Sequence, residues 1–443
     1  MIYKARYVLP MDGRIVEPGE VLVRDGEIGT VGTGLAEAHP AEPTCDLGKC
    51  ALLPGFVNAH SHIDLTLARN KVDALNLWDW IDAVCYNKSR VPDYETVTLS
   101  AKLGAAECVR SGVTCLGDST FTGAAAEALG ALGLRGIAYL EVFGQSAGVS
   151  YAQVFHKRLD DVREQQSACS QLITIGISPH TIYTSNRELL RLCTDTCAEL
   201  GIPVAFHLAE TRAEADYSLD GTGPISDWRR RLGYEPMASG LRPAEYLHQI
   251  GFLRPGVCLA HCVDLSPQEV ELVARSGVGV AHCPRSNAYL GAGIAPVAEL
   301  VAAGADVGIG TDSAGSCLRF DFFEEMRFAL ALQRARAEDA ATITAKDVLR
   351  LATVGGARAL GLADRIGTIE PGKSADLIAV DLSKVLPGED IWLAVLSRSP
   401  SDVRLVVVNG CEVVRDGLPV GLDLRALRTE LEGRLESWLE TDS

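Results

Sequence analysis

The sequence LPGFVNAHSH, residues 53–62, is a short apolar run that ends in two histidines one residue apart. The apolar run predicts a buried β-strand, and residues i and i+2 of a strand point to the same face of a sheet. His60 and His62 are therefore expected to project together from a strand end, an arrangement that suits one divalent transition metal. Taken alone, the pair is explained as well by an ordinary polar strand end.

The same pattern recurs farther along the chain. Four more short apolar runs end in residues that can bind a metal or move a proton: His207 with Glu210 close behind it, His261, His282 and Asp312. Structural explanations exist for single members, since an aspartate can cap a following helix and a glutamate can lie in a solvated loop. The repetition at successive strand ends favours a metal site.

The spacing of these runs predicts the architecture. Short apolar strands alternate with helix-length segments, which indicates βαβ units and a parallel sheet. Eight strands are counted between about residues 51 and 320, beginning near Leu52, Thr114, Gly136, Ile173, Val204, Val257, Val278 and Val307. Eight such units form a (β/α)8 TIM barrel of the α/β class, in which active sites gather at the C-terminal strand ends. The polar residues are therefore expected to converge on one mouth.

The composition is that of a large globular chain. With 443 residues, of which 47% are hydrophobic, the chain can bury a large core, and its length suggests two or three domains. No apolar stretch approaches the roughly 18 residues that span a bilayer, and MIYKAR opens a strand rather than a signal peptide, so a cytoplasmic protein without a membrane partner is expected. The net charge of −17 argues against a nucleic-acid surface and favours a small-molecule substrate. The thirteen cysteines include no CxxC pair, which favours free buried thiols.

Five motifs, PGFVNAHSH, HLAET, AHC, AHCPRSN and GIGTDS, resemble those of the amidohydrolase superfamily, and most closely its branch of metal-dependent adenosine-type deaminases and chlorohydrolases. The resemblance covers nearly the whole chain. It implies a barrel of residues 51–360, a small β-sandwich built from residues 1–50 and 361–420, and a C-terminal helix at 421–443. The residues alone indicate only a β-rich accessory domain, because both end segments read as turn-bounded strands.

The resemblance also implies roles at the strand ends. His60, His62, His207 and Asp312 match the family's metal ligands and leave one position for water, whose pKa a cation lowers toward about 7. Glu210 matches the general acid/base that protonates a substrate ring nitrogen and passes the proton to the leaving group. His261 matches the histidine that holds the attacking water. Asp312 is expected to accept a proton from this water.

The same resemblance predicts one metal ion. Binuclear members use a carboxylated lysine on the fourth strand, and TIGISPH, residues 174–180, contains no lysine. Zinc is expected, with iron or manganese as alternatives, because three histidines and an aspartate accept each of them. The HxE and PCxxC signature of the other zinc deaminases is absent, so deamination would use the barrel. A homo-oligomer, a dimer, is expected by analogy only.

Two segments point to a nucleoside substrate. SPHTIYT, residues 178–184, resembles the stretch with which adenosine-type deaminases contact ribose, so His180 is a candidate hydroxyl partner, with a structural histidine as the alternative. Trp80 or Trp78 lies where related enzymes place an aromatic lid, and one of the two is expected in the core because of their helical spacing. The long polar stretch 212–243 is a candidate second cover.

Segments LEVFGQS (140–146) and CPRSN (283–287) look most like 6-amino-6-deoxyfutalosine deaminases of menaquinone biosynthesis, which convert a 6-amino purine to the 6-oxo purine. On that resemblance Glu141 would accept hydrogen bonds from ribose hydroxyls, and Arg285 would pair with a benzoate carboxylate. The structural alternatives are that Glu141 is buried and paired with a neighbouring residue and that Arg285 holds a loop in place. The alternative substrates are methylthioadenosine or S-adenosylhomocysteine, the latter disfavoured because residues 141–150 contain no arginine. Triazines or other heterocycles are a further possibility, and a non-enzymatic scaffold is disfavoured because every ligand position is filled.

Overall fold

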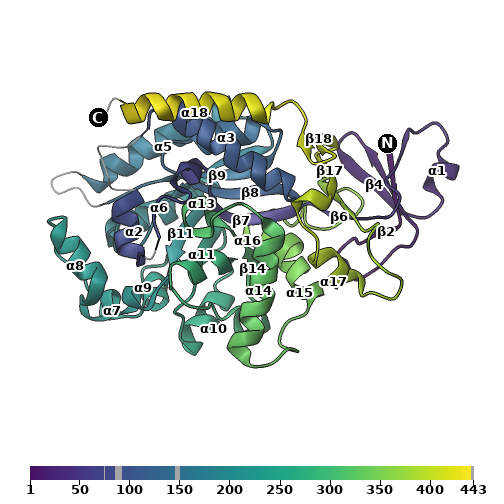
Figure 1. Cartoon of the computed structure of the whole chain (residues 1–443). Coiled ribbons are helices and arrows are strands. Elements are labelled where there is room, and N and C mark those ends of the chain that lie inside the picture. Colours follow the sequence, from purple (N-terminus) through teal and green to yellow (C-terminus); the bar gives the residue numbers. More distant parts are fainter. Residues whose placement is uncertain (74, 85–91, 145–149, 441–443) are drawn as a thin grey trace.

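Eight parallel strands close into a barrel in the computed structural model of this chain (Figure 1), which describes residues 1–73, 75–84, 92–144 and 150–440. The barrel strands are β7 (Phe56–His62), β8 (Val113–Thr120), β9 (Arg135–Glu141), β10 (Ile173–Ser178), β11 (Val204–Leu208), β12 (Val257–His261), β13 (Gly279–His282) and β14 (Asp306–Ile309). Pairing of β14 with β7 closes the barrel, and the short strand β15 (Asp312–Ser313) also pairs with β7. The predicted barrel is confirmed, and all strands after the first begin within one residue of their predicted positions.

The first barrel strand begins later than predicted. The strand expected near Leu52 is β6 (Cys50–Pro54), which belongs to a sheet outside the barrel, and β7 begins only at Phe56. The chain passes from one sheet to the other at Gly55, where an added Cβ would lie 2.1 Å from Oγ1 of Thr114. The sequence does not reveal this change of sheet, because a strand that is buried on both faces has the same apolar pattern in either sheet.

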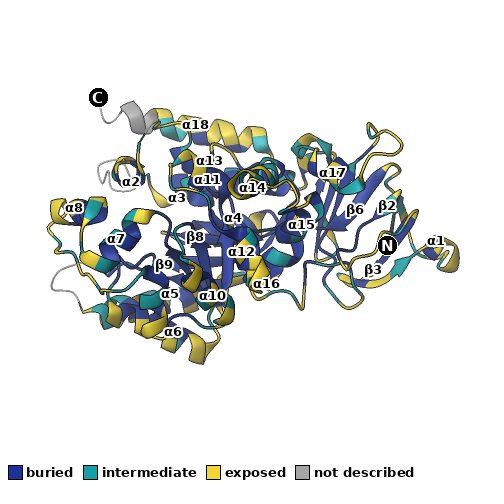
Figure 2. Ribbon diagram, turned by 90° about the horizontal axis from the view of Figure 1, so that it is seen from below, coloured by how far each residue is buried: buried dark blue, intermediate teal, exposed yellow. Residues whose placement is uncertain are grey.

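Helices surround the barrel, and their outward faces are exposed while the strands are buried (Figure 2). A typical one, α6 (Arg187–Leu200), begins where the Asn186 side chain accepts a hydrogen bond from the Leu189 amide and ends at Gly201, whose φ of 67° suits glycine. The other helices up to the end of the barrel are η1 (Ile63–Ala68), α2 (Leu77–Val84), α3 (Tyr94–Arg110), α4 (Ala124–Ala131), α5 (Tyr151–Ala168), α7 (Arg212–Asp220), α8 (Gly223–Arg231), α9 (Pro243–Gln249), α10 (Pro267–Arg275), α11 (Pro284–Tyr289), α12 (Val297–Ala302), α13 (Ala314–Cys317), α14 (Phe322–Ala337), α15 (Ala345–Arg350), the π-helical η3 (Leu351–Gly355) and α16 (Gly356–Ala359).

Strands from both ends of the chain form two more sheets beside the barrel (Figure 1). The four-stranded sheet contains, in spatial order, β4 (Glu27–Gly32), β3 (Gly19–Arg24), β1 (Ile2–Ala5) and β5 (Thr44–Asp46). The six-stranded sheet contains β19 (Leu418–Pro419), β18 (Cys411–Arg415), β17 (Val403–Val408), β16 (Leu377–Asp381), β6 and β2 (Tyr7–Val8). Tyr3 and Val21 of the first sheet share a buried apolar cluster with Leu377 and Val407 of the second, so the two sheets pack together.

The C-terminal part of the chain contacts the barrel at two places. Buried Arg135 of β9 donates from Nε to Oδ2 of Asp376 at 2.8 Å, which ties the barrel to the six-stranded sheet. The long helix α18 (Leu424–Glu440) lies along α3, where Leu427 and Leu431 pack with Leu99 (Figure 1). The remaining short helices are α1 (Leu35–Ala38), α17 (Ile391–Leu396) and η4 (Pro400–Asp402).

The polar stretch 212–243, predicted to be a cover, is mostly helical. It forms α7 and α8 and continues to the start of α9. Nε1 of Trp228 on α8 donates to Oδ1 of Asp82 on α2 at 2.7 Å, so the helix that carries the two lid tryptophans is braced by this insertion. Across the ranges given above, no helix is long and apolar enough to cross a membrane, and every cysteine within them is a free thiol.

Candidate metal centre

The four residues predicted as metal ligands lie together at the barrel mouth. His60 and His62 are on β7, His207 on β11 and Asp312 on β15, and all are buried. Nε2 of His62 lies 3.2 Å from Nε2 of His207. Oδ1 of Asp312 lies 3.7 Å from Nε2 of His60 and 3.6 Å from Nε2 of His62. These ring nitrogens and this oxygen converge on one small volume.

The chemistry of the cluster fits a divalent cation. Nε2 of His62 and Nε2 of His207 face each other at 3.2 Å, so their lone pairs repel unless a proton or a cation lies between them. Burial opposes a charge on His62, but the nearby carboxyls of Glu141 and Asp312 raise its pKa, so the surroundings of this ring favour a positive charge. Nε2 of His60 is buried and has no hydrogen-bond partner. Burial lowers the pKa of His60 to about 4 and that of His207 well below its usual value, so both rings are neutral, as metal ligation requires. Nδ1 of His207 lies 3.2 Å from the carbonyl oxygen of His180, which leaves Nε2 for the ion.

Asp312 is held by hydroxyl groups on one side and faces the histidines on the other. Burial opposes its ionisation, but contact with His60 and the other nearby histidines holds its pKa well below the usual range. Oδ2 accepts hydrogen bonds from Oγ of Ser286 at 2.5 Å and from Oγ of Ser316 at 2.7 Å. These two hydroxyls orient the carboxylate so that Oδ1 points to His60 and His62.

Glu210 and His261, the predicted proton-transfer residues, lie next to each other. Nε2 of His261 is 3.8 Å from Oε1 of Glu210. Nδ1 of His261 lies 2.9 Å from Oδ1 of Asn287, and an amide oxygen can only accept, so Nδ1 donates this hydrogen bond and Nε2 faces Glu210. Burial raises the pKa of Glu210, which favours its protonated form. Buried Glu214 accepts from the Glu210 amide at 3.2 Å, and burial raises its own pKa to about 8.

The backbone is strained at several of these positions. Non-glycine residues rarely adopt positive φ, and such outliers concentrate at functional sites. Here φ is 55° at His180, 48° at Ala209, 72° at His261 and 59° at Asp312. The strain therefore coincides with the strand ends that carry the predicted chemistry.

The predicted ribose contacts lie at the ends of β9 and β10, next to the metal cluster. Glu141 at the end of β9 is 4% exposed, its Oε1 has no hydrogen-bond partner, and burial raises its pKa to about 7. Its carboxylate lies within 4.8 Å of ring nitrogens of His62 and His207. The His180 ring follows β10, with Nδ1 2.8 Å from Oγ1 of Thr184. Gln145 and Ser146 of the motif that contains Glu141 lie outside the described residues.

Both lid tryptophans are buried on α2. Trp80 is 8% exposed, and its Nε1 donates to the carbonyl of Gly315 at 3.3 Å. Trp78 is 6% exposed and meets the Tyr183 ring edge to face, with centroids 5.3 Å apart. The structure thus packs both rings against the protein, and stacking of Trp80 on a base stays a prediction.

The predicted contact between Arg285 and a substrate carboxylate is corrected by the structure. Arg285 is 1% exposed, and its Nε donates to Oε2 of Glu325 at 2.6 Å. Nη1 donates to Oε2 of Glu324 at 2.6 Å and Nη2 to the carbonyl of Arg319. All three guanidinium nitrogens are therefore engaged inside the chain, and Arg285 anchors α11 to α14. The motif around Arg285 does not include its acidic partners, so the motif alone could not predict these ion pairs.

Several buried polar residues near the site were missed by sequence reasoning. Asn287 and Ser286 lay in a motif already noted, and Glu214 follows Glu210 by one helical turn. Asp64 and Asp118 are buried near His62, and burial raises the pKa of both carboxyls. A signal existed for these two, because each is an isolated charge within an otherwise apolar or hydroxyl-bearing stretch.

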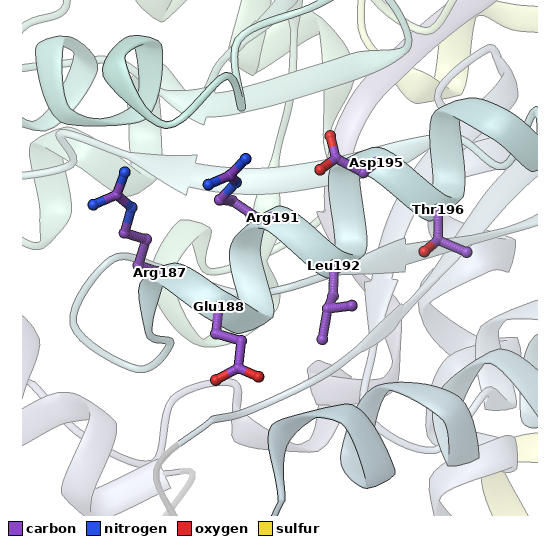
Figure 3. A pocket seen from close by; sticks show the side chains of 6 residues that line it. All are labelled: Arg187, Glu188, Arg191, Leu192, Asp195 and Thr196. Carbon is purple, nitrogen blue, oxygen red and sulfur yellow. The ribbon is translucent and has the colours of Figure 1, made fainter.

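A surface groove is present on one of the helices that surround the barrel (Figure 3). It runs along α6 and is lined by Arg187, Glu188, Arg191, Leu192, Asp195 and Thr196. None of the predicted site residues lines it. The candidate functional site is therefore the polar cluster at the mouth.

Comparisons with known proteins agree with this geometry. The model of the amidohydrolase family matches residues 51–413. A 5-methylthioadenosine/S-adenosylhomocysteine deaminase of Moorella thermoacetica is 34% identical over 438 residues, which are 97% of each chain. The crystal structure of an adenosine deaminase from Xanthomonas campestris with bound zinc has a TM-score of 0.87 and 30% identity, covering 99% of this chain and 98% of the other. The aminofutalosine deaminase of Helicobacter pylori shares the fold, with a TM-score of 0.82, 20% identity, and coverage of 93% of this chain and 100% of that one. The chain therefore belongs to the amidohydrolase family and groups with its deaminases.

Proposed function

We propose that this protein is a metal-dependent deaminase that converts the 6-amino group of an adenosine-type nucleoside to a 6-oxo group and releases ammonia. The observation that carries the proposal is the meeting of three buried histidines and Asp312 at one mouth with a separate acid, Glu210, 3.8 Å from His261. A cation held by His60, His62, His207 and Asp312 supplies hydroxide near neutral pH. We propose zinc, because the Xanthomonas campestris relative holds zinc in its crystal structure.

The residues around the cluster divide the proton transfers between them. The Glu210 carboxyl, whose pKa burial raises, gives its proton to a purine ring nitrogen, and the product keeps that proton. Of the two protons of the attacking water, one is passed through Asp312 to the amino group, which leaves as ammonia, and the other restores the Glu210 carboxyl as the 6-oxo group forms. His261, with its proton fixed on Nδ1 by Asn287, presents Nε2 to the attacking water. Asp312 is held ionised by the adjacent histidines and accepts a proton from that water.

The substrate proposed first is a 5′-thio nucleoside. The Moorella thermoacetica relative is named for 5-methylthioadenosine and S-adenosylhomocysteine, and it covers almost the whole of this chain. The case for 6-amino-6-deoxyfutalosine depended partly on a contact between Arg285 and its carboxylate, and that guanidinium is bound by Glu324 and Glu325. 6-Amino-6-deoxyfutalosine therefore stays in the substrate panel as the competing nucleoside.

Two residues are proposed to hold the ribose. The buried Glu141 carboxylate has an unpartnered oxygen close to the metal cluster, and ribose hydroxyls are suitable donors to it. Burial lowers the pKa of His180 to about 3, so its ring is neutral. A neutral imidazole can donate a hydrogen bond to a ribose hydroxyl or accept one from it.

The test is an ultraviolet assay of the full chain after removal of metal and reloading with zinc, iron or manganese. Methylthioadenosine, S-adenosylhomocysteine, adenosine and 6-amino-6-deoxyfutalosine are compared by the adenine-to-hypoxanthine shift and by ammonia release. We expect zinc-dependent release of one ammonia per purine converted, fastest with methylthioadenosine. A zinc-loaded protein that deaminates no purine would contradict the proposal and direct the search to triazines. A protein that neither retains nor responds to metal would favour a scaffold.

A further inference from the structure

A row of three aromatic rings leads from the metal cluster to solvent. The His180 ring lies 4.9 Å, centroid to centroid, from the ring of ligand His207. Phe143 lies 4.8 Å from His180, and Phe121 stacks on Phe143 at 4.9 Å with an interplanar angle of 29°. We name His180, Phe143 and Phe121 the aromatic row.

The outer ring of this row is exposed. Phe121 is 58% exposed, Phe143 is half-buried, and the innermost ring touches a fully buried metal-site histidine. A single exposed phenylalanine is unremarkable on a protein surface. A stacked pair continuous with the site is different, because it offers an apolar face whose inner end is already at the metal cluster.

The position of the row fits one end of the proposed substrate. Its rings follow β8, β9 and β10, whereas Glu210 and His261 follow β11 and end β12. β10 and β11 are neighbours in the barrel, and Phe143 lies 4.8 Å, centroid to centroid, from His180, one of the two proposed ribose contacts. A purine whose ring nitrogen meets Glu210 and whose ribose meets Glu141 and His180 therefore extends its 5′ substituent toward the aromatic row.

The charges around the row favour an uncharged substituent. Within residues 120–123, 141–144 and 178–184 there is no lysine or arginine, and Glu141 is the acidic residue among them. Arg158 of α5 lies near enough to influence the charge of Glu141, but its Nη1 donates to Asp161 at 3.3 Å. A carboxylate at the 5′ end would meet aromatic rings and Glu141, whereas a thioether or alkyl group would cover Phe121.

We infer that Phe121 and Phe143 form the binding surface for an apolar 5′ substituent, so that this enzyme prefers nucleosides with an uncharged 5′-thioether or alkyl group. This inference rests on the proposed deaminase function and narrows its substrate class. Burial of a methylthio group against an aromatic ring contributes roughly a tenfold gain in affinity.

The test compares kcat/KM for methylthioadenosine, adenosine and S-adenosylhomocysteine with the zinc-loaded full chain and its F121A, F121L and Y94A variants. Tyr94, 53% exposed on α3, is the matched exposed aromatic outside the row. We expect F121A to lose about tenfold in kcat/KM for methylthioadenosine, mainly through KM, with adenosine changed much less. F121L is expected to recover part of the loss, and Y94A to match the wild type.

Three outcomes would overturn the inference. One is an equal loss for adenosine and methylthioadenosine in F121A, which would indicate a structural role. Another is no loss for either nucleoside. The third is a wild-type preference for S-adenosylhomocysteine that disappears in R158A, because the 5′ group would then be recognised by charge. In each of these three outcomes the zinc-loaded wild type still deaminates a nucleoside. If the proposed function itself is wrong, the zinc-loaded wild type deaminates none of the nucleosides, so the two kinds of failure can be distinguished.

Discussion

Around the barrel mouth, the residues carried by β11, β12 and β15 differ in kind from those that follow β8, β9 and β10. On the first side, here the polar side, Asp312 is held by Ser286 and Ser316, and His261 by Asn287. On the second side, here the aromatic side, Phe121 is 58% exposed and contacts Phe143 through its ring face. Buried hydrogen bonds hold the residues of the polar side, whereas the aromatic side combines two stacked phenylalanine rings with the proposed ribose contacts Glu141 and His180.

This difference separates the two tasks of an enzyme site. Groups that transfer protons or hold a metal act only in a narrow geometry, which buried hydrogen bonds from the scaffold maintain. A surface that accepts part of a substrate depends on area and shape, and loss of area changes affinity by small factors. Substitutions on the polar side should therefore lower kcat or metal content, and those on the aromatic side should act on KM.

The largest effect is expected from His207→Ala, at the metal ligand that β11 carries on the polar side. Removal of one of three imidazole ligands leaves Asp312 and two histidines, and we expect metal content to fall below one half equivalent and activity to become undetectable. Metal analysis of the purified protein checks this. His248→Ala, an exposed histidine on α9, is the control. Full retention of zinc by H207A would remove His207 from the ligand set.

Glu210→Gln tests the polar side without touching the metal. The amide keeps the shape of the carboxyl but cannot transfer a proton, so we expect kcat to fall about 10²–10⁴-fold while zinc content stays at the wild-type level. The wild-type pH profile should show the same group, with kcat/KM falling as pH rises through the raised pKa of Glu210, because its acid form is needed. Glu188→Gln on the exposed side of α6 is the control. Unchanged kcat in E210Q would exclude Glu210 as the acid.

The polar side was largely predictable from the sequence, and the aromatic side was not. His207 and Asp312 each end an apolar run, so the strand pattern alone predicts their position at the mouth. Phe121 and Phe143 follow strands in the same way, but a phenylalanine after a strand is no different in sequence from a core residue. Their exposure and stacking depend on where neighbouring loops lie, which periodicity does not report.

Errors in the sequence interpretation have the same origin. Arg285 was placed in the right motif, but its partners Glu324 and Glu325 lie on α14, some forty residues later in the chain, and only the fold brings them together. The start of the barrel was misplaced because the transition between sheets at Gly55 leaves no change in hydrophobicity. Position along a strand can be predicted from local pattern, whereas side-chain partners distant in sequence cannot.

A smaller effect is expected from the residues that orient the site. Asn287→Ala removes the acceptor that fixes the His261 proton on Nδ1, and Ser286→Ala removes one of two donors to Asp312. Loss of such supporting hydrogen bonds costs about 10–100-fold in activity or metal affinity. We expect N287A to lower kcat with zinc retained, and S286A to weaken zinc binding in a competition titration with a chelator.

Ser167→Ala, an exposed serine on α5, is the control for both variants. Asn287→Asp is the conservative comparison, because a carboxylate also accepts from Nδ1 and should restore much of the lost kcat. If N287A and S286A changed only KM, the hydrogen bonds would be serving substrate binding, and the division between the two sides of the mouth would be wrong.

The smallest effect is expected in stability, from Glu214 beneath the polar side. Burial raises its pKa to about 8 from a usual value of 4.5, so the folded protein keeps a proton that the unfolded chain releases as pH rises. The contribution of this group to stability is therefore complete below about pH 4.5 and is lost as pH rises through about 8. The glutamine of Glu214→Gln does not titrate. The Tm of this variant should therefore match that of the wild type at pH 5. At pH 9 it should exceed the wild-type Tm by about 2–4 °C for each kcal/mol of stability that the wild type has lost through ionisation of Glu214. Thermal unfolding scans at the two pH values check this, with E188Q as the control. If the difference in Tm between E214Q and the wild type does not change with pH, Glu214 is ionised in the folded protein at both pH values.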